Sequence, residues 1–270
     1  MELNYLKDII ILGGVKIMKD EIKNYAKEIG VDDIGFASVS NYKSPNTPPI
    51  KDIYPKTKTI IVLAFQQLDN FESNNEQIAS VGNKITTEFA NTCTYKVARF
   101  VKQKFKAKVI SIPVLTPVNR DIKTGLPYAD VSLRHSAVAA GLGSFGRHNL
   151  VIHPLLGTRV IFTAIITDLE IQPDSPVQGN MCTDCNVRVD QCPVNALAQE
   201  GKTDVMKCML NSQPYGFVGN AAFWTKFSES TPDEQKIMLK DKKFKKIYDV
   251  MTLSTQYVCF NCIKNCPVGN

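Results

Sequence analysis

The sequence predicts an α+β protein with two domains, and three observations support this prediction. Apolar runs typical of strands alternate with segments of helical periodicity through the first two thirds of the chain. The sequence lacks the regular short strand–helix–strand units that mark a doubly wound nucleotide-binding fold. Seven of the eight cysteines lie in the last third, which distinguishes that part from the rest. With 270 residues and 44% hydrophobic content, the chain can bury a substantial core.

The N-terminal elements can be assigned from local pattern. A helix is expected from Lys19 onward, with Gly30 as its C-terminal stop. Its apolar positions recur at helical spacing, and they are Ile22, Tyr25, Ala26 and Ile29. A short strand is expected over 34–39. The proline-rich stretch 44–55 predicts a loop, because proline lacks a backbone donor and restricts the residue before it.

Three further strands and a long helix are expected after this loop. The β-branched run 59–65 predicts an interior strand, and 109–114 and 159–167 predict two more. Residues 86–106 favour a long helix. Its candidate core contacts are Phe89, Val97, Val101 and Phe105. Cys93 lies within this helix and is expected to be a small buried hydrophobic residue.

A glycine-rich segment lies between the last two of these strands. Ser132 is expected to cap a helix of small residues that ends near Gly141. Gly141, Gly143 and Gly146 would then let the backbone approach a flat or anionic ligand. The spacing is not a dinucleotide-binding fingerprint, because here a helix precedes it and a strand follows. A glycine-rich helix terminus without a ligand is the alternative.

The cysteines form two runs with a single cysteine between them. They read Cys182-x2-Cys185-x6-Cys192-Pro193, then Cys208, then Cys259-x2-Cys262-x3-Cys266-Pro267. In the pattern C-x2-C-x2-C-x3-C-P, three close cysteines hold one iron–sulfur cluster and the fourth binds the other cluster. On this template Arg188 replaces a cysteine of the first run, and Gln256 replaces one of the second. Cys208 can fill the second vacancy.

Exchanging the cysteines that precede proline then gives two ligand sets. The complete set consists of Cys192, Cys208, Cys259 and Cys262, and the incomplete set consists of Cys182, Cys185 and Cys266. Arginine has no lone pair to offer iron, so the incomplete site fits a site-differentiated [4Fe–4S] cluster, a [3Fe–4S] cluster, or a fourth ligand from oxygen or Cys93. Structural zinc is the alternative metal. A disulfide framework is less consistent with the chain, because nothing marks it for an oxidising compartment.

Charge and hydropathy give a general cellular context. The net charge of +6 is spread widely, apart from a lysine run formed by Lys240, Lys242, Lys243, Lys245 and Lys246. Such a run is typical of a solvated helix face, or alternatively of a surface that docks an acidic redox partner. No stretch reaches the ~20 apolar residues needed to span a bilayer, and no secretory signal is evident, so a cytoplasmic protein without membrane contact is expected. Residues 13–18 read like a translated ribosome-binding site followed by Met18. We therefore expect 1–17 to be an upstream extension.

The glycine-rich and cysteine motifs together resemble one family. The stretch A-G-L-G-x-x-G-(R/K)-x-N-L at 140–150, the strand start at 157–159 and the cysteine tail resemble epoxyqueuosine reductases. These are corrinoid-dependent iron–sulfur proteins that share a fold with reductive dehalogenases. The resemblance spans roughly Met18 to Cys266. It implies a nitroreductase-like cofactor-binding domain over 18–175 and a ferredoxin-like domain with two clusters over 176–270.

The resemblance also implies roles for individual residues. The loop from Gly141 to Leu150 would help to cradle a corrinoid such as cobalamin, with the three glycines giving clearance. Arg134, Arg147 and Asn149 are the candidates for polar contacts with it. The groups near the corrinoid that could donate a proton are Tyr128, Asp130, Arg134 and His135. The alternatives are a packing role for Tyr128, a helix cap for Asp130, a surface ion pair for Arg134 and an ordinary polar contact for His135.

Two departures from the family affect the expected substrate. Epoxyqueuosine reductases carry a V-D-T-G-P segment whose aspartate donates a proton, whereas this chain has residues 126–130, where Asp130 is out of register. Arg188 is the second departure. Both weigh against tRNA as the substrate and leave a small or nucleoside-like molecule.

Three functional hypotheses follow. The first is an oxidoreductase that receives electrons from a low-potential donor and relays them through two clusters to a corrinoid-type cofactor for substrate reduction. The second is an electron-transfer or reductive-activation protein for a corrinoid or flavin partner, with no substrate chemistry of its own. The third is a degenerate homologue with a structural role. The complete four-cysteine set disfavours the third hypothesis.

Overall fold

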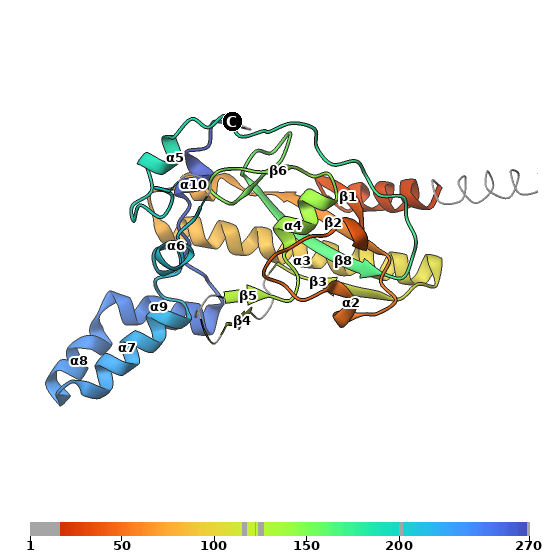
Figure 1. The fold of residues 1–270 in the computed structure, drawn as a ribbon. Helices are drawn as coiled ribbons and strands as arrows, with labels where there is room; N and C mark the ends of the chain where they lie inside the picture. Colours follow the sequence, from red (N-terminus) through yellow and green to blue (C-terminus); the bar gives the residue numbers. More distant parts are fainter. Residues whose placement is uncertain (1–16, 115–117, 122, 124–126, 200–201, 269–270) are drawn as a thin grey trace, which may run out of the picture. The chain divides into compact units, whose positions relative to one another are not determined.

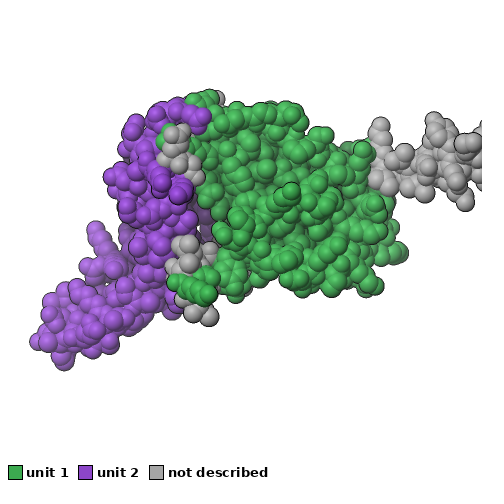
Figure 2. Space-filling view, viewed as in Figure 1, with its two compact units in different colours: residues 1–66, 86–183, 268–270 green, residues 67–85, 184–267 purple. Residues whose placement is uncertain are grey.

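The computed structural model describes residues 17–114, 118–121, 123, 127–199 and 202–268, and it has two compact units. Unit 1 comprises 1–66, 86–183 and 268–270, and unit 2 comprises 67–85 and 184–267 (Figure 2). The long helix α3 (Glu76–Phe105) contributes residues to both. The division at 175/176 expected from the sequence stays a prediction. Residues 1–16 of the expected extension lie outside the described residues.

A four-stranded antiparallel sheet forms the framework of unit 1. Its strand order is β1 (Asp33–Ser38), β2 (Thr59–Gln66), β8 (Val160–Thr167) and β3 (Val109–Ile112) (Figure 1). The two inner strands, β2 and β8, are buried on both faces, which explains their continuous apolar sequences. Val62 pairs with Gly35 on one side and with Ala164 on the other. The predicted α+β class and the interior position of the 59–65 strand are confirmed.

Hydrophobic clusters cover both faces of this sheet. Alternate residues of β2 divide between them, since Ile61 and Leu63 belong to one cluster and Ile60 and Val62 to the other. The first cluster contains Ile22 and Ala26 of the helix over 17–28, together with the α3 residues Val97 and Val101. The second contains α4 (Leu133–Ala139) residues and Ile50 of α2 (Ile50–Ile53). The predicted loop over 44–55 therefore includes one short helix that anchors it.

The long helix differs from its prediction in two ways. It begins at Glu76, ten residues before the predicted start at Thr86, because its first turns pack in unit 2. Phe89 is 46% exposed and was wrongly predicted as a core residue, although its ring meets that of Phe65 edge-on at 6.0 Å. Cys93 is buried in the first cluster, where its thiol donates to the carbonyl of Ile29 at 3.4 Å. Burial raises the pKa of this thiol, which is the behaviour of a core residue.

Shorter elements complete unit 1. Two hairpins pair β4 (Val118–Arg120) with β5 (Pro127–Ala129) and β6 (Ser144–Phe145) with β7 (Val151–Ile152). A 3-10 turn, η1 (Val39–Asn41), follows β1.

Unit 2 is mainly helical. Besides η2 (Asp69–Glu72) and the start of α3, it contains α5 (Val187–Asp190), α6 (Val205–Ser212), α7 (Phe217–Glu229), α8 (Pro232–Lys240), α9 (Lys242–Leu253) and α10 (Asn261–Lys264). Phe71 and Ala79 pack with Phe260, which lies between two cysteines of the second run. Lys264 also donates to the carbonyl of Glu72 at 3.3 Å. Residues 67–85 are thus part of the cysteine-rich unit. In the described part of the chain, every helix is too short or too polar to cross a bilayer.

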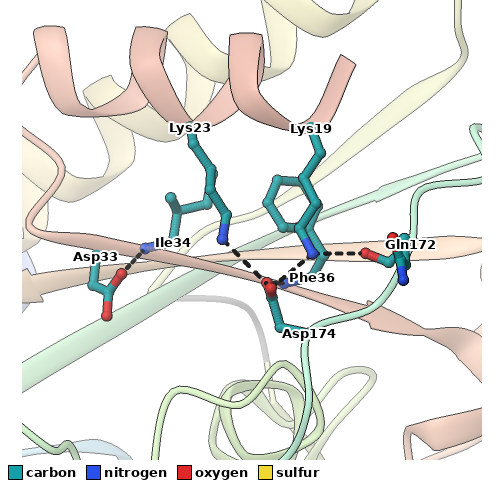
Figure 3. Close-up of polar contacts among 7 residues, drawn as sticks. All are labelled: Lys19, Lys23, Asp33, Ile34, Phe36, Gln172 and Asp174. Atoms are coloured by element: carbon teal, nitrogen blue, oxygen red, sulfur yellow. Dashed lines mark hydrogen bonds and ion pairs between the residues drawn. The ribbon is translucent and has the colours of Figure 1, made fainter. Parts of the chain in front are cut away.

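A carboxylate fixes the segment that leaves β8 against the edge strand β1. Asp174 accepts from the backbone N–H of Phe36 at 3.0 Å, and its own N–H donates to the Phe36 carbonyl at 2.8 Å. Lys19 and Lys23 reach from the first helix to the same carboxylate, at 2.7 and 3.4 Å (Figure 3). Asp174 therefore joins the first helix, the sheet edge and the outgoing segment.

We expect Asp174→Ala to lower the free energy of unfolding by about 2 kcal/mol, because it leaves the Phe36 N–H without its acceptor. Asp174→Asn keeps an acceptor oxygen and loses mainly the part-exposed ion pairs, so it should cost about 1 kcal/mol or less. Urea denaturation measures both. Equal losses in the two variants would contradict this assignment.

Candidate functional site

Ser132 organises the start of α4, as predicted. Its hydroxyl accepts from the backbone N–H of His135 at 3.4 Å and lies 2.8 Å from the Nδ1 atom of the same histidine. Its own N–H donates to the Tyr42 hydroxyl at 2.8 Å. Asp130 does not cap this helix, because its carboxylate accepts from the Asn119 side chain at 3.0 Å instead. The alternative of Asp130 as the helix cap is therefore wrong.

His135 is held in a defined orientation. Its half-buried ring lies against Phe145 with centroids 4.8 Å apart. The Ser132 hydroxyl proton can be donated to Nδ1, which leaves Nε2 to carry the ring proton. Burial, and next the neighbouring Arg134 charge, lower the pKa of His135. The ring is therefore favoured in its neutral form, as a potential hydrogen-bond donor.

This shift predicts a pH dependence of stability. Because the pKa of His135 is lower in the folded than in the unfolded state, the unfolded chain binds the proton better. The stabilisation should be complete above the ordinary pKa of 6.5 and should decrease as the pH falls through the folded-state value. We expect the difference in melting temperature between the unchanged protein and His135→Gln to narrow from pH 7.5 to about pH 5. A difference that stays constant with pH would contradict this.

Arg134 closes the loop that follows α4. Its guanidinium donates to the backbone carbonyl of Asn149, a residue in the left-handed conformation at φ 61°. Within the loop, Gly146 donates to the Leu150 carbonyl at 2.8 Å, and Asn149 donates to the Gly146 carbonyl at 2.9 Å. The structure therefore brings Arg134, Gly146, Asn149 and Leu150 together. The Asn149 contact stabilises the loop, and the surface ion pair considered for Arg134 stays a prediction.

The three glycines are required by the fold itself. A Cβ atom on Gly141 would lie 2.3 Å from the Ser175 carbonyl oxygen, and one on Gly143 would lie 2.3 Å from that of Ile152. A Cβ atom on Gly146 would lie 2.5 Å from the ring of His148. Gly141 also ends α4 in a Schellman motif, with Leu142 donating to Ala137 at 2.9 Å. The atoms that come close to these three glycines are thus atoms of the chain itself. A role of the glycines in binding a cofactor stays a prediction.

Two buried histidines stabilise this region, and no sequence motif identifies their roles. His148 is buried beside Gly146, and its Nδ1 accepts from the Leu150 N–H at 3.1 Å. His153 is 1% exposed and lies 3.1 Å from the carboxylate of Asp33 in β1. Burial alone would raise the pKa of Asp33, but the hydrogen bond with His153, followed by that from the Ile34 N–H, lowers it.

The remaining candidates in unit 1 are less constrained. Tyr128 pairs with Asn119 in the β4–β5 hairpin, and Asp130 is exposed just after it. Among the described residues, no hydrogen bond joins Tyr128 or Asp130 to His135. Arg147 is half-buried in the glycine loop. A cavity of about 800 Å³ lies elsewhere in unit 1, at the end of β1, and is lined by Ser40, Lys51, Lys58 and Glu170 among others.

The cysteines lie mainly in unit 2, and none of the eight, all of which are described, takes part in a disulfide. Cys182 falls in unit 1, while the other six ligand candidates fall in unit 2. Cys208 is exposed on α6, Cys262 lies in α10, and Cys192 follows α5. The sulfur of Cys192 accepts from the Ala196 N–H at 3.3 Å, a contact that suits a thiolate ligand. Arg188 lies in α5, and its side chain is outside the described residues.

The donor chemistry fits iron–sulfur clusters, but the ligand sets are not assembled in this geometry. Seven thiols can supply the soft ligands that iron–sulfur clusters require. In the described part of the chain, no three histidine, cysteine or carboxylate side chains lie close enough to hold a metal ion. The pairing of ligands therefore still rests on the sequence register.

Comparisons in sequence find epoxyqueuosine reductases among the relatives of this chain. No protein-family model matches the chain. The chain is 26% identical to the epoxyqueuosine reductase of Bacillus cereus, over 88% of this chain and 63% of that protein. It is 23% identical to the epoxyqueuosine reductase of Staphylococcus aureus, over 95% of this chain and 67% of that protein. The chain thus spans only about two thirds of the length of these relatives.

Solved structures share the fold. A selenomethionine-labelled epoxyqueuosine reductase superposes with a TM-score of 0.61 at 21% identity, covering 94% of this chain and 66% of that one. A reductive dehalogenase, studied for B12-dependent dehalogenation, superposes with a TM-score of 0.55 at 16% identity over 87% of this chain and 36% of that one. The chain therefore resembles the epoxyqueuosine reductases in sequence over most of its length, and in fold it resembles both these enzymes and a reductive dehalogenase.

Proposed function

We propose that this protein is an iron–sulfur oxidoreductase that relays electrons through two clusters to a corrinoid-type cofactor, for reduction of a small or nucleoside-like substrate. The observation that carries this proposal is the cysteine register, which yields one complete set of four thiolates and one set of three. This register occurs in a chain whose sequence and mixed α/β fold resemble epoxyqueuosine reductases. The proposed architecture is a nitroreductase-like domain followed by a ferredoxin-like domain.

The two ligand sets would differ in their properties. Cys192, Cys208, Cys259 and Cys262 would hold a [4Fe–4S] cluster, and Cys182, Cys185 and Cys266 would hold the three-cysteine cluster. Such clusters, when bound, pass single electrons. Arg188 occupies the missing ligand position, and its positive charge would favour the reduced, more negative cluster and raise that cluster's reduction potential.

Residues of the glycine loop would hold the corrinoid. The guanidinium of Arg147 and the amide of Asn149 have the hydrogen-bond donors that suit the amides and phosphate of such a cofactor, and Leu150 offers an apolar contact. Arg134 would act through the loop, because its guanidinium is already engaged with the Asn149 carbonyl. A corrinoid, when bound, would supply low-valent cobalt as a nucleophile. The B12 dependence of the structurally similar dehalogenase supports this choice.

His135 is the best placed of the proposed proton donors. Reduction of a substrate consumes protons as well as electrons, and a general acid must be oriented towards the reacting group. The Ser132 contact fixes the orientation of the imidazole. Because the lowered pKa favours the neutral ring, the imidazole would have to take up a proton before it could act as the general acid. Tyr128 and Asp130 are the other candidates, on the β5 strand and just after it. Ser132 is then a positioning residue.

The proposed substrate class rests on the relatives of this chain and on the two positions where its sequence departs from them. One similar structure, an epoxyqueuosine reductase at 21% identity and a TM-score of 0.57, contains an epoxyqueuosine-modified tRNA-Tyr stem loop. The out-of-register Asp130 and Arg188 weigh against that substrate here, and a free nucleoside-like molecule or another small molecule is the proposal. The displaced aspartate also favours the second candidate function, a protein that delivers electrons to a corrinoid or flavin partner.

Anaerobic purification distinguishes these functions. We expect iron and sulfide for two clusters, an extractable corrinoid, and paramagnetic signals that change on reduction. Clusters without any corrinoid or flavin, even after reconstitution, would instead support the electron carrier. Iron and sulfide absent altogether, or zinc in their place, would refute both redox functions.

The cluster register predicts the effect of restoring the missing ligand. Arg188→Cys should complete the three-cysteine site, raise its iron content towards four and change its paramagnetic signal. Arg188→Ala removes the charge without adding a ligand and is the matched control. An unaltered iron content and spectrum in the cysteine variant would contradict the register.

A further inference from the structure

A helical segment separates two cysteines of the complete set. Helices α7, α8 and α9 lie between Cys208 and Cys259. They are held together by their own aromatic core, in which the ring of Phe223 lies 5.6 Å from that of Phe244 and 5.2 Å from that of Trp224. The capping box of Thr231 and Glu234 fixes the start of α8. The segment is therefore an ordered platform within unit 2.

Lysines outnumber carboxylates on this platform. The lysines are Lys226, Lys236, Lys240, Lys242, Lys243, Lys245 and Lys246, and the carboxylates are Glu229, Asp233, Glu234, Asp241 and Asp249. Four of the five carboxylates are engaged. Asp233 pairs with Lys236, Glu234 forms the capping box, Asp241 caps α9, and Asp249 pairs with Lys245.

The lysine run divides into two groups with different roles. Lys246 is largely buried, pairs with Glu76 and lies over the rings of Tyr215 and Tyr257, while Lys245 pairs with Asp249. Lys240, Lys242 and Lys243 are exposed at the α8–α9 junction. Within the described part of the chain their side chains make no hydrogen bond or ion pair. The junction therefore presents three free positive charges to solvent.

Apolar side chains are exposed on the same two helices. Ile237 in α8 is 69% exposed, and Tyr248 and Met251 in α9 are 52% and 64% exposed. Exposed apolar side chains together with charged ones are typical of a protein-docking surface. Aliphatic side chains such as Ile237 offer little to a sugar–phosphate backbone, which favours a protein partner over an RNA.

This surface is connected to a proposed cluster ligand. Asp249 accepts from the Tyr257 hydroxyl at 3.1 Å, and Lys246 contacts the Tyr257 ring, so α9 is fixed to the residues that precede Cys259. An electron donor has to dock close to the first cluster that it reduces. The platform lies between Cys208 and Cys259 in the chain, and its contacts with Tyr257 link it to the segment that carries Cys259.

We propose that the α8–α9 junction docks an acidic one-electron carrier protein of the ferredoxin class, which reduces the complete cluster. The inference rests on the proposed function. The reduced carrier loses one electron and the oxidised cluster gains it, and no bond forms or breaks. The carrier's carboxylates would face Lys240, Lys242 and Lys243, which would increase the association rate at low ionic strength.

A charge-reversal triple variant tests this surface. K240E/K242E/K243E leaves every described contact of these helices in place, and the acidic residues at the start of α9 suit the helix dipole. K51E/K96E/K102E makes the same charge change at exposed lysines of unit 1 and is the matched control. Each cluster-loaded protein is mixed by stopped flow with reduced acidic [2Fe–2S] ferredoxin. The second-order rate should fall about tenfold or more in the junction variant at low salt, change less in the control, and converge at about 0.5 M salt.

The other outcomes are also decisive. Equal rates in the two variants, with clusters that dithionite reduces normally, would refute the docking surface and leave the proposed function intact. Absence of clusters in the unchanged protein would refute both. A tRNA anticodon stem loop, titrated by fluorescence anisotropy, is the second probe. Loss of RNA affinity in the junction variant, with an unchanged ferredoxin rate, would assign the surface to nucleic acid and overturn the proposal.

Discussion

Replacing Cys208 by alanine should leave the complete set with three thiolates, as at the Arg188 site, and should change the paramagnetic signal of that cluster, lower its iron content by about one atom, or do both, while the other cluster stays unchanged. Cys208 lies alone between the two cysteine runs, and the register makes it the ligand that completes the four-thiolate set. Its side chain is exposed on α6, and alanine is a strong helix former, so the substitution should not disturb the helix. Iron and sulfide analysis, together with paramagnetic resonance of the reduced protein, measure the change.

Cys93→Ala is the control for this experiment. Cys93 is buried in the hydrophobic cluster of unit 1 and its thiol donates to a backbone carbonyl, so its loss should lower stability slightly and leave the iron content unchanged. If Cys208→Ala leaves both the iron content and the paramagnetic signals unaltered, Cys208 is not a ligand. If Cys93→Ala loses iron, the fourth ligand of the three-cysteine site has to be sought there.

Replacing Gly141 by alanine should lower the free energy of unfolding by about 2–4 kcal/mol. Two costs combine at this position. The backbone has φ 73°, which L side chains rarely adopt, and the added Cβ would lie 2.3 Å from the Ser175 carbonyl oxygen. Backbone on both sides has to shift, and the Schellman end of α4 would be disturbed with it.

Gly179→Ala separates these two costs. Gly179 has a similar φ of 82°, but nothing lies within 4 Å of the position of its Cβ. It should therefore show only the conformational strain, about 1 kcal/mol. Denaturant unfolding of both variants gives the difference due to close approach. Equal destabilisation would show that the Ser175 carbonyl yields easily, and the rigid loop inferred around Gly141 would be wrong.

Local patterns predicted much of unit 1 because they act over a few residues. The N-cap role of Ser132, the stop at Gly30, the order of helix before strand around the glycines and the buried strands over 59–65 and 159–167 were all predicted from neighbours along the chain. The errors have a tertiary origin. Phe89 follows the apolar spacing of its helix but is exposed, and the start of α3 is stabilised by unit 2.

The sequence predicted which residues form the candidate site, but it did not predict the contacts among them. The sequence identified Arg134, Asn149 and His135, but it could not show that Arg134 binds the Asn149 carbonyl or that Ser132 orients the His135 ring. It identified three glycines as points of close approach to a ligand or, alternatively, as a helix end without one, and the structure adds that the chain's own atoms lie beside each of them. Such contacts depend on where distant segments meet, which no short-range pattern encodes.

The sequence by itself determined the number and spacing of the thiolate ligands, the missing ligand at Arg188 and the family that the chain resembles, because these depend only on the order of residues. Only the tertiary structure decided that residues 67–85 belong with the cysteine-rich unit and that Asp174 joins the first helix to the sheet edge. It also decided that Lys246 is structural, while the side chains of Lys240, Lys242 and Lys243 have no ion pair among the described residues. Each of these depends on which side chains folding buries or pairs, and those partners lie far apart in the chain.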